Sequence, residues 1–104
     1  MIYVSVYNRE SGFLQHDMAL TGVVAEPDPS GITTVVIESL PPGIYAVAGF
    51  LDENDNGKFD TNFLGIPKEK YGFSNDVRPL MRAATYKEAS FNISSVKTIS
   101  IHLK

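Results

Sequence analysis

The sequence predicts an all-β domain, built as a sandwich of two sheets with about seven short strands. Apolar and polar side chains alternate in several short runs, for example at residues 2–7 and 99–104. Turns rich in proline and glycine separate these runs. Helix signals are nearly absent: Thr85 and Glu88 have the spacing of one capping box, which predicts a single helical turn over residues 86–89.

The strands are predicted in chain order from their composition. Residues 2–7 alternate apolar and polar, and residues 22–25 and 32–37 are rich in β-branched side chains on either side of a Pro-Asp-Pro-Ser-Gly turn. Residues 44–51 are apolar throughout, which predicts a central strand buried on both faces. Ile, Ile and Leu alternate with Ser, His and Lys over residues 99–104, which predicts a closing strand.

Length and composition restrict the class of protein. The 104 residues suit one domain with an ordinary core, so residues 1–104 are treated as a single domain. The net charge is −3 and no basic stripe is present, so nucleic-acid binding is not expected. The absence of cysteine excludes disulfides, thiolate nucleophiles and zinc–thiolate clusters, and the apolar runs are too short for a transmembrane segment. Met1 leads directly into the first strand, so either the chain is cytoplasmic or a signal peptide has been removed.

The strongest chemical signal is the run Asp-Glu-Asn-Asp-Asn-Gly-Lys-Phe-Asp at residues 52–60. It places oxygen-bearing side chains at alternate positions around a glycine, and calcium takes six to eight oxygen ligands from such a loop. The register matches the first nine positions of an EF-hand loop. The candidate ligands are Asp52, Asn54, Asn56, the carbonyl of Lys58, and Asp60.

The run departs from an EF-hand at its end and in its flanks. Phe63 occupies the twelfth position, where a bidentate glutamate is expected, and a strand rather than a helix precedes the loop. Glu69 or Asp76 could fold back to supply the missing carboxylate. Magnesium fits less well, because it requires a near-ideal octahedron. The alternative interpretation is a tight hairpin turn at Asn56-Gly57 with acidic neighbours that favour solvation.

A second unusual stretch, residues 63–75, is rich in glycine and aromatic side chains. Tyr71 and Phe73 could form a platform for a sugar or a peptide, because aromatic rings offer large apolar faces. The alternative is that the two rings pin this loop to the sandwich and shape the metal site.

Catalysis is not expected from this sequence. The histidines are His16 and His102, and spacing ties no serine or glutamate to either of them. His102 is predicted to lie on the outward face of the last strand. Asp52, Asp60 and Glu69 could provide a carboxylate pair for a small hydrolase, but that chemistry requires a cleft, which so small a sandwich rarely provides.

Three motifs resemble the uncharacterised bacterial proteins grouped as domain of unknown function 2141. They are Leu-Pro-Pro-Gly-Ile-Tyr-Ala-Val at residues 40–47, the acidic run at residues 52–60, and Leu-Gly-Ile-Pro-Lys-Glu-Lys-Tyr-Gly-Phe-Ser-Asn at residues 64–75. The resemblance implies a small periplasmic or secreted protein whose signal peptide is absent from this chain, and it implies no activity. The Leu-Pro-x-Gly-x-Tyr turn is also similar to prealbumin-like sandwich domains of surface proteins, in which such acidic loops look like calcium sites. The predicted fold is accordingly an immunoglobulin-like or prealbumin-like sandwich of two sheets.

Together these features predict an extracytoplasmic β-sandwich of unknown biological role with a structural calcium loop. The competing interpretation is a glycan- or peptide-binding module in which the metal orders Tyr71 and Phe73, and a small hydrolase is the third.

Overall fold

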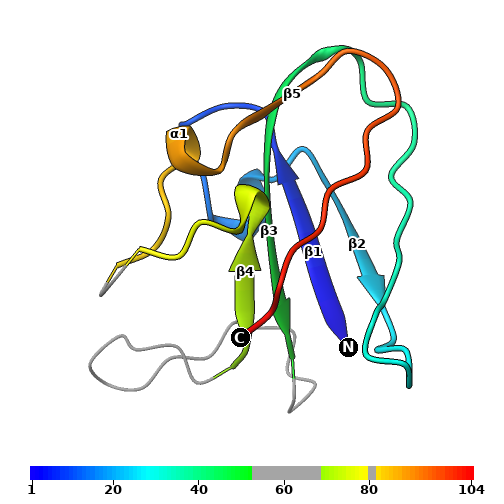
Figure 1. Ribbon diagram of the computed structural model, residues 1–104. Helices are drawn as coiled ribbons and strands as arrows, with labels where there is room; N and C mark the ends of the chain where they lie inside the picture. The colour runs from blue at the N-terminus through cyan, green and yellow to red at the C-terminus, as the bar shows by residue number, and fades with distance from the viewer. Residues whose placement is uncertain (53–68, 80–81) are drawn as a thin grey trace.

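The computed structural model describes residues 1–52, 69–79 and 82–104 (Figure 1). In these residues the chain is mostly β, with very little helix. The elements in chain order are β1 (Ile2–Tyr7), the 3₁₀ turn η1 (His16–Met18), β2 (Thr21–Ala25), β3 (Gly43–Leu51), β4 (Tyr71–Phe73), the 3₁₀ turn η2 (Ser74–Asp76), α1 (Tyr86–Ala89) and β5 (Phe91–Ile93).

The described strands form one open antiparallel sheet. Four of them follow the order β2-β1-β3-β4, and β5 pairs with the first residues of β3. β1 pairs with β2 through Ile2 opposite Ala25, and with β3 through Tyr3 opposite Phe50. β3 is therefore the central strand, as its apolar sequence predicted.

The predicted sandwich of two sheets and about seven strands is not confirmed: the described residues hold five strands in a single sheet. Residues 32–37 and 99–104 were predicted to be strands, but neither segment is a strand in the structure, although Lys104 exchanges two backbone hydrogen bonds with Tyr71 of β4. Their alternation shows which side of an extended chain faces the core. A strand also needs a neighbouring backbone at hydrogen-bonding distance, and alternation carries no information on that.

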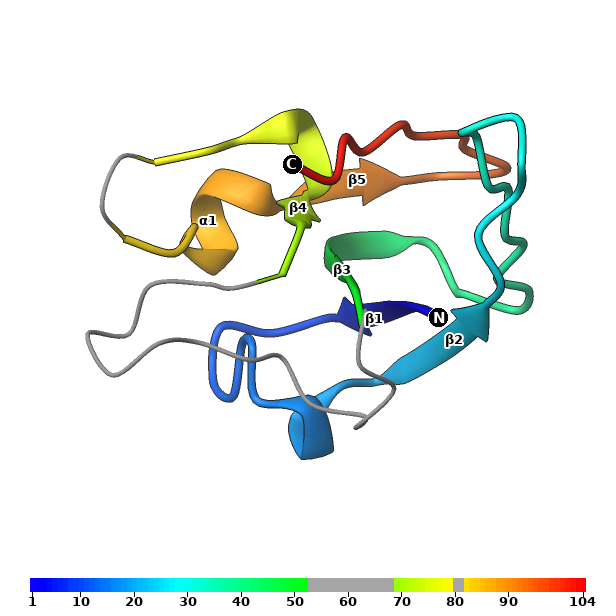
Figure 2. The ribbon, with the colours of Figure 1, turned by 90° about the horizontal axis from the view of Figure 1, so that it is seen from below.

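β3 buries side chains on both of its faces because successive side chains of a strand point to opposite sides. One buried cluster contains Val6, Tyr45 and Val47, and the carboxyl-terminal Ile99 and Ile101 pack against it. Figure 2 shows β5 and the carboxyl-terminal segment on one side of β1 and β2. The second cluster comprises Ala46, Phe73, Ala84 and Ala89.

A buried serine connects β3, β4 and α1. β4 pairs with β3 as far as Ala48, and β5 pairs with β3 up to Tyr45, so Val47 lies between these two stretches. The Val47 N–H donates to Ser74 Oγ over 2.9 Å, and the Ser74 hydroxyl donates to the carbonyl of Ala89 over 2.5 Å. Ser74 has no exposed surface, and its side chain thus continues the hydrogen bonding of β3 at Val47, which neither β4 nor β5 pairs with.

Residues close together in the sequence determine the start of α1 and the turn before β3. The predicted capping box is present: Thr85 Oγ1 accepts the Glu88 N–H, and the Glu88 carboxylate accepts the Thr85 N–H. α1 consequently begins at Tyr86, as predicted. In the turn before β3, the Tyr45 hydroxyl donates to the Pro41 carbonyl over 2.5 Å, which ties the turn to the core.

Candidate functional site

The two carboxylates that border the predicted calcium loop are buried. Asp52 follows the last residue of β3 and is 1% exposed, and Glu69 lies just before β4 and is 7% exposed. The Leu51 N–H donates to the Lys70 carbonyl over 2.8 Å, so the chain on either side of the loop closes beside both carboxylates. The Asp52 backbone is also fixed to the amino terminus, because its N–H donates to the Met1 carbonyl over 2.8 Å and its carbonyl accepts from the Met1 amino group over 3.2 Å.

Asp52 and Glu69 are the two predicted metal residues that the structure describes. The other four, Asn54, Asn56, Lys58 and Asp60, lie outside the described residues. In residues 1–52, 69–79 and 82–104, no three His, Cys, Asp or Glu side chains are grouped to hold a metal ion. Asp52 and Glu69 alone cannot supply the six to eight oxygens that calcium takes, so a calcium site here would need further oxygen ligands.

The aromatic pair is built into the protein. Phe73 is 6% exposed and belongs to a core cluster, and Tyr71 is half-buried with its ring edge-on to Phe73 at 5.6 Å between centroids. The guanidinium of Arg78 lies 4.1 Å from the centroid of the Tyr71 ring, close enough for a cation–π contact. Phe73 thus presents no open face to a ligand, and Arg78 covers part of Tyr71. This arrangement is the one expected if the rings pin the loop.

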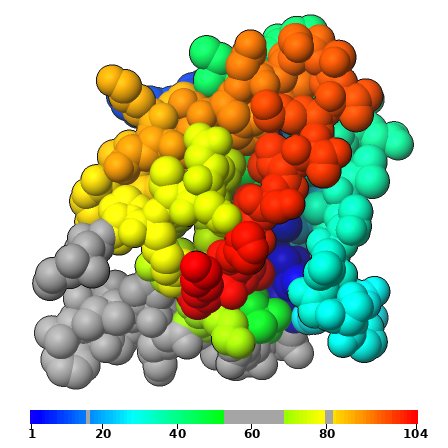
Figure 3. All heavy atoms as spheres, viewed as in Figure 1, coloured from blue at the N-terminus to red at the C-terminus, as the bar shows by residue number. Residues whose placement is uncertain are grey.

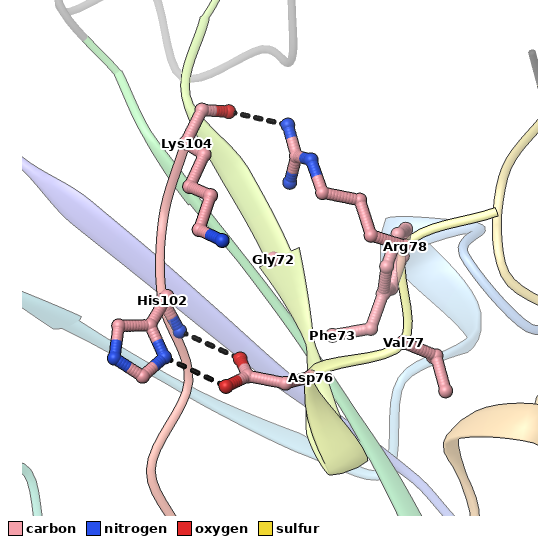
Figure 4. Close-up of a pocket in the computed structure, with 7 residues that line it drawn as sticks. All are labelled: Gly72, Phe73, Asp76, Val77, Arg78, His102 and Lys104. Carbon is pink, nitrogen blue, oxygen red and sulfur yellow. Dashed lines mark hydrogen bonds and ion pairs between the residues drawn. The ribbon is translucent and has the colours of Figure 1, made fainter. Parts of the chain in front are cut away.

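Beside β4, a polar cluster holds the carboxyl-terminal segment (Figure 4). Asp76 Oδ1 accepts the backbone N–H of His102 over 2.9 Å, and Asp76 Oδ2 lies 2.7 Å from Nδ1 of the His102 ring. The backbone hydrogen bond, followed by the ring contact, holds the pKa of the Asp76 carboxyl below its usual value. Arg78 donates to the Lys104 carbonyl over 2.6 Å and to the Tyr71 carbonyl over 2.9 Å.

This cluster is an anchor rather than a ligand pocket. The hollow that it lines around Gly72 has a volume of about 10 Å³, which is room for about one water molecule. Asp76 was a candidate to complete the calcium site, but both of its oxygens contact His102. His102 is exposed, as predicted, with 67% of its side chain accessible.

Sequence reasoning missed Gly72, Arg78 and Ser74, which organise this region. Gly72 is needed because a Cβ there would lie 2.5 Å from the His102 carbonyl oxygen, and no single-residue pattern reveals such an approach. The sequence does place Asp76 and Arg78, two residues apart, directly after a Gly-Phe-Ser-Asn turn. This spacing indicates a polar cluster, but it does not identify the carboxyl-terminal segment as the partner that the two side chains bind.

No helix within the described ranges has the length and apolar character needed to cross a membrane. A family model described as "Uncharacterized protein conserved in bacteria (DUF2141)" matches residues 1–101. No curated protein and no solved structure matches the chain.

Proposed function

Because the chain belongs to the uncharacterised bacterial family DUF2141, which carries no assigned activity, we propose a function from its own residues: a β domain stabilised by calcium at the loop that follows β3. The proposed ligands are Asp52 and Glu69 at the base, together with Asn54, Asn56, the Lys58 carbonyl and Asp60 within the loop. The ion would have a structural role, in which it ties the loop to the end of β3.

The burial of two carboxylates at the base of one loop carries this proposal. Asp52 and Glu69 are 1% and 7% exposed, and they flank the hydrogen bond from Leu51 to Lys70. Carboxylate oxygens are the ligands that calcium prefers, and a divalent cation adds favourable charge to carboxylates that are held out of water. A plain acidic hairpin turn would leave its carboxylates in water, so burial favours the metal interpretation over the turn interpretation.

Thermal unfolding in calcium and in chelator tests the proposal. A ligand that binds only the folded state at 100 times its dissociation constant adds about 2.7 kcal/mol of stability. For 104 residues, about 2.1 cal/mol/K of unfolding entropy per residue converts this into a rise of about 12 °C in Tm. We expect the rise with calcium, and a much smaller one with magnesium at the same concentration.

Matched variants separate a specific site from general charge screening. Asp52→Asn and Asp60→Asn each remove the negative charge of a proposed ligand and leave only an amide oxygen, and each should strongly reduce the calcium-dependent rise. Asp17→Asn removes the same charge from an exposed position in η1 and should leave the rise intact. An unchanged Tm at millimolar calcium for the wild-type protein would refute the site.

We further propose that the protein works outside the cytoplasm, in the periplasm or as a secreted protein. This proposal is supported by the resemblance stated in the sequence analysis and by the high calcium of extracellular settings, where weak sites of this class are occupied. No enzymatic activity is proposed. Fractionation of cells that express the gene tests the proposed location outside the cytoplasm. Recovery of the protein with cytoplasmic markers would contradict that location.

A further inference from the structure

The carboxyl-terminal segment is attached to the domain mainly at its end. We call residues 97–104 the strap. In the described part of the chain, the hydrogen bonds of the strap backbone lie at His102 and Lys104, and the other strap residues make none. Ile99 and Ile101 add apolar packing against one core cluster. Figure 3 shows the strap, in orange-red to red, on the surface beside the yellow-green atoms of β4 and η2.

The end of the strap docks on the first residue of β4. The Lys104 N–H donates to the Tyr71 carbonyl over 3.1 Å, and the Tyr71 N–H donates to the Lys104 carbonyl over 3.4 Å. Arg78 reinforces this pair, because it donates to both carbonyls. Asp76 holds the strap two residues earlier through its two contacts with His102 (Figure 4). Tyr71 must therefore be in place before the last residue of the strap can pair.

The same stretch of chain carries a proposed calcium ligand. Glu69 lies two residues before Tyr71 and is 7% exposed. Between them, the Lys70 carbonyl accepts the Leu51 N–H over 2.8 Å, so this stretch lies between the end of β3 and the end of the strap. β4 is only three residues long, and so short a strand has few hydrogen bonds of its own to fix where it begins. A ligand that holds Glu69 therefore also holds the first residue of β4.

We propose that calcium binding at the base of the loop and docking of the strap are coupled, so that each favours the other. This inference rests on the calcium site proposed above and gives that site an effect beyond the loop itself. Calcium holds Glu69 and thereby the start of β4, on which the strap docks through Lys104. Without calcium the strap opens more often, and the opening uncovers the core cluster that Ile99 and Ile101 contact.

The coupling must act in both directions. If calcium favours the docked strap, the docked strap must raise the affinity for calcium by the same factor, because one free energy describes both effects. Such coupling energies usually correspond to factors of about 5–150. The strap can therefore be perturbed away from the metal ligands, and the effect can be measured as a change in calcium affinity.

Amide hydrogen exchange of the wild-type protein measures the first direction. The N–H groups of His102 and Lys104 report opening of the strap, since each donates to a group outside it. In saturating calcium their exchange should be at least about fivefold slower than in chelator. The Gly31 N–H donates to the Asp28 carbonyl within a separate exposed turn, and its exchange should not change.

Two proline variants within the strap measure the second direction. His102→Pro removes the N–H that Asp76 accepts, together with the ring contact. It should weaken calcium binding by about fivefold or more in titration calorimetry. Ser100→Pro is the matched control, because the Ser100 N–H has no hydrogen-bond partner among the described residues. This control should bind calcium as tightly as the wild-type protein does.

Arg78→Ala provides a second test if His102→Pro fails to fold. The variant removes a positive charge beside β4, which by charge alone would favour the binding of a cation. Loss of the docked strap should instead weaken calcium binding by about fivefold or more. Arg82→Ala removes the same charge from a side chain that pairs with Glu88, and it should not weaken calcium binding.

The results separate the coupling from the calcium site itself. If calcium raises Tm but leaves exchange at His102 and Lys104 unchanged, the calcium site stands and the coupling is wrong. Equal calcium affinity in the wild-type protein and in folded His102→Pro would also overturn the coupling. If calcium neither binds nor raises Tm, both proposals are wrong.

Discussion

Replacing Ser74 with alanine tests whether a single hydroxyl holds β3, β4 and α1 together. The substitution removes the acceptor of the Val47 N–H and the donor to the Ala89 carbonyl. Ser74 and Ala89 have no exposed surface, and Val47 is 7% exposed, so water cannot readily replace either bond. Each polar group left without a partner in a buried site costs about 1–3 kcal/mol.

The expected loss for Ser74→Ala is therefore about 2–6 kcal/mol in the free energy of unfolding. This is a large fraction of the roughly 5–15 kcal/mol that stabilises a typical domain. With about 2.1 cal/mol/K of unfolding entropy for each of the 104 residues, the loss corresponds to a drop of about 10–27 °C in Tm.

Urea unfolding followed by circular dichroism measures this loss, and Ser90→Ala is the matched control. The Ser90 hydroxyl donates to the Lys87 carbonyl over 2.9 Å, but that bond is exposed to solvent. The control should change stability by no more than about 0.5 kcal/mol. If Ser74→Ala and Ser90→Ala destabilise equally, the assigned role of Ser74 is wrong.

Two further predictions concern the carboxyl-terminal anchor and the capping box. Gly72→Ala should destabilise by about 1–3 kcal/mol in urea unfolding, because its Cβ would lie 2.5 Å from the His102 carbonyl oxygen. Gly49→Ala, whose Cβ would be 3.5 Å from its nearest neighbour, should be close to neutral, and equal effects would contradict the predicted clash. Hydrogen bonding to Arg82, then to Thr85, lowers the pKa of Glu88 from its usual 4.5 to about 2. The folded-state pKa is the lower one, so this contribution to stability is present above pH 4.5 and is lost as the pH falls from 4.5 to about 2. Urea midpoints across that range should show a steeper acid loss for the wild-type protein than for Glu88→Gln, and parallel profiles would refute the assignment.

Much of the local structure could be predicted because its cause is local. The alternation of residues 2–7 reflects a half-buried strand, and the apolar run at residues 44–51 reflects burial on both faces of β3. Thr85 and Glu88 fix the start of α1, because the capping box involves groups only three residues apart.

The partners of each segment could not be predicted in the same way. Residues 32–37 and 99–104 have strand composition, yet neither segment forms a strand in the structure. Ser74 reads as an ordinary turn residue, although its role depends on Val47, 27 residues away. A side chain's propensity describes its own conformation, whereas pairing depends on which distant backbone arrives beside it.

For the candidate metal site, the sequence alone determined the ligand types and their spacing, since carboxylate and amide oxygens at alternate positions suit calcium wherever the loop lies. Only the tertiary structure decided that Asp52 and Glu69 are both buried beside one closing hydrogen bond. It also decided that Phe73 fills the core and that Asp76 holds His102. The physical reason is that burial and hydrogen-bond partners are set by segments distant in the chain, whose approach no local pattern encodes.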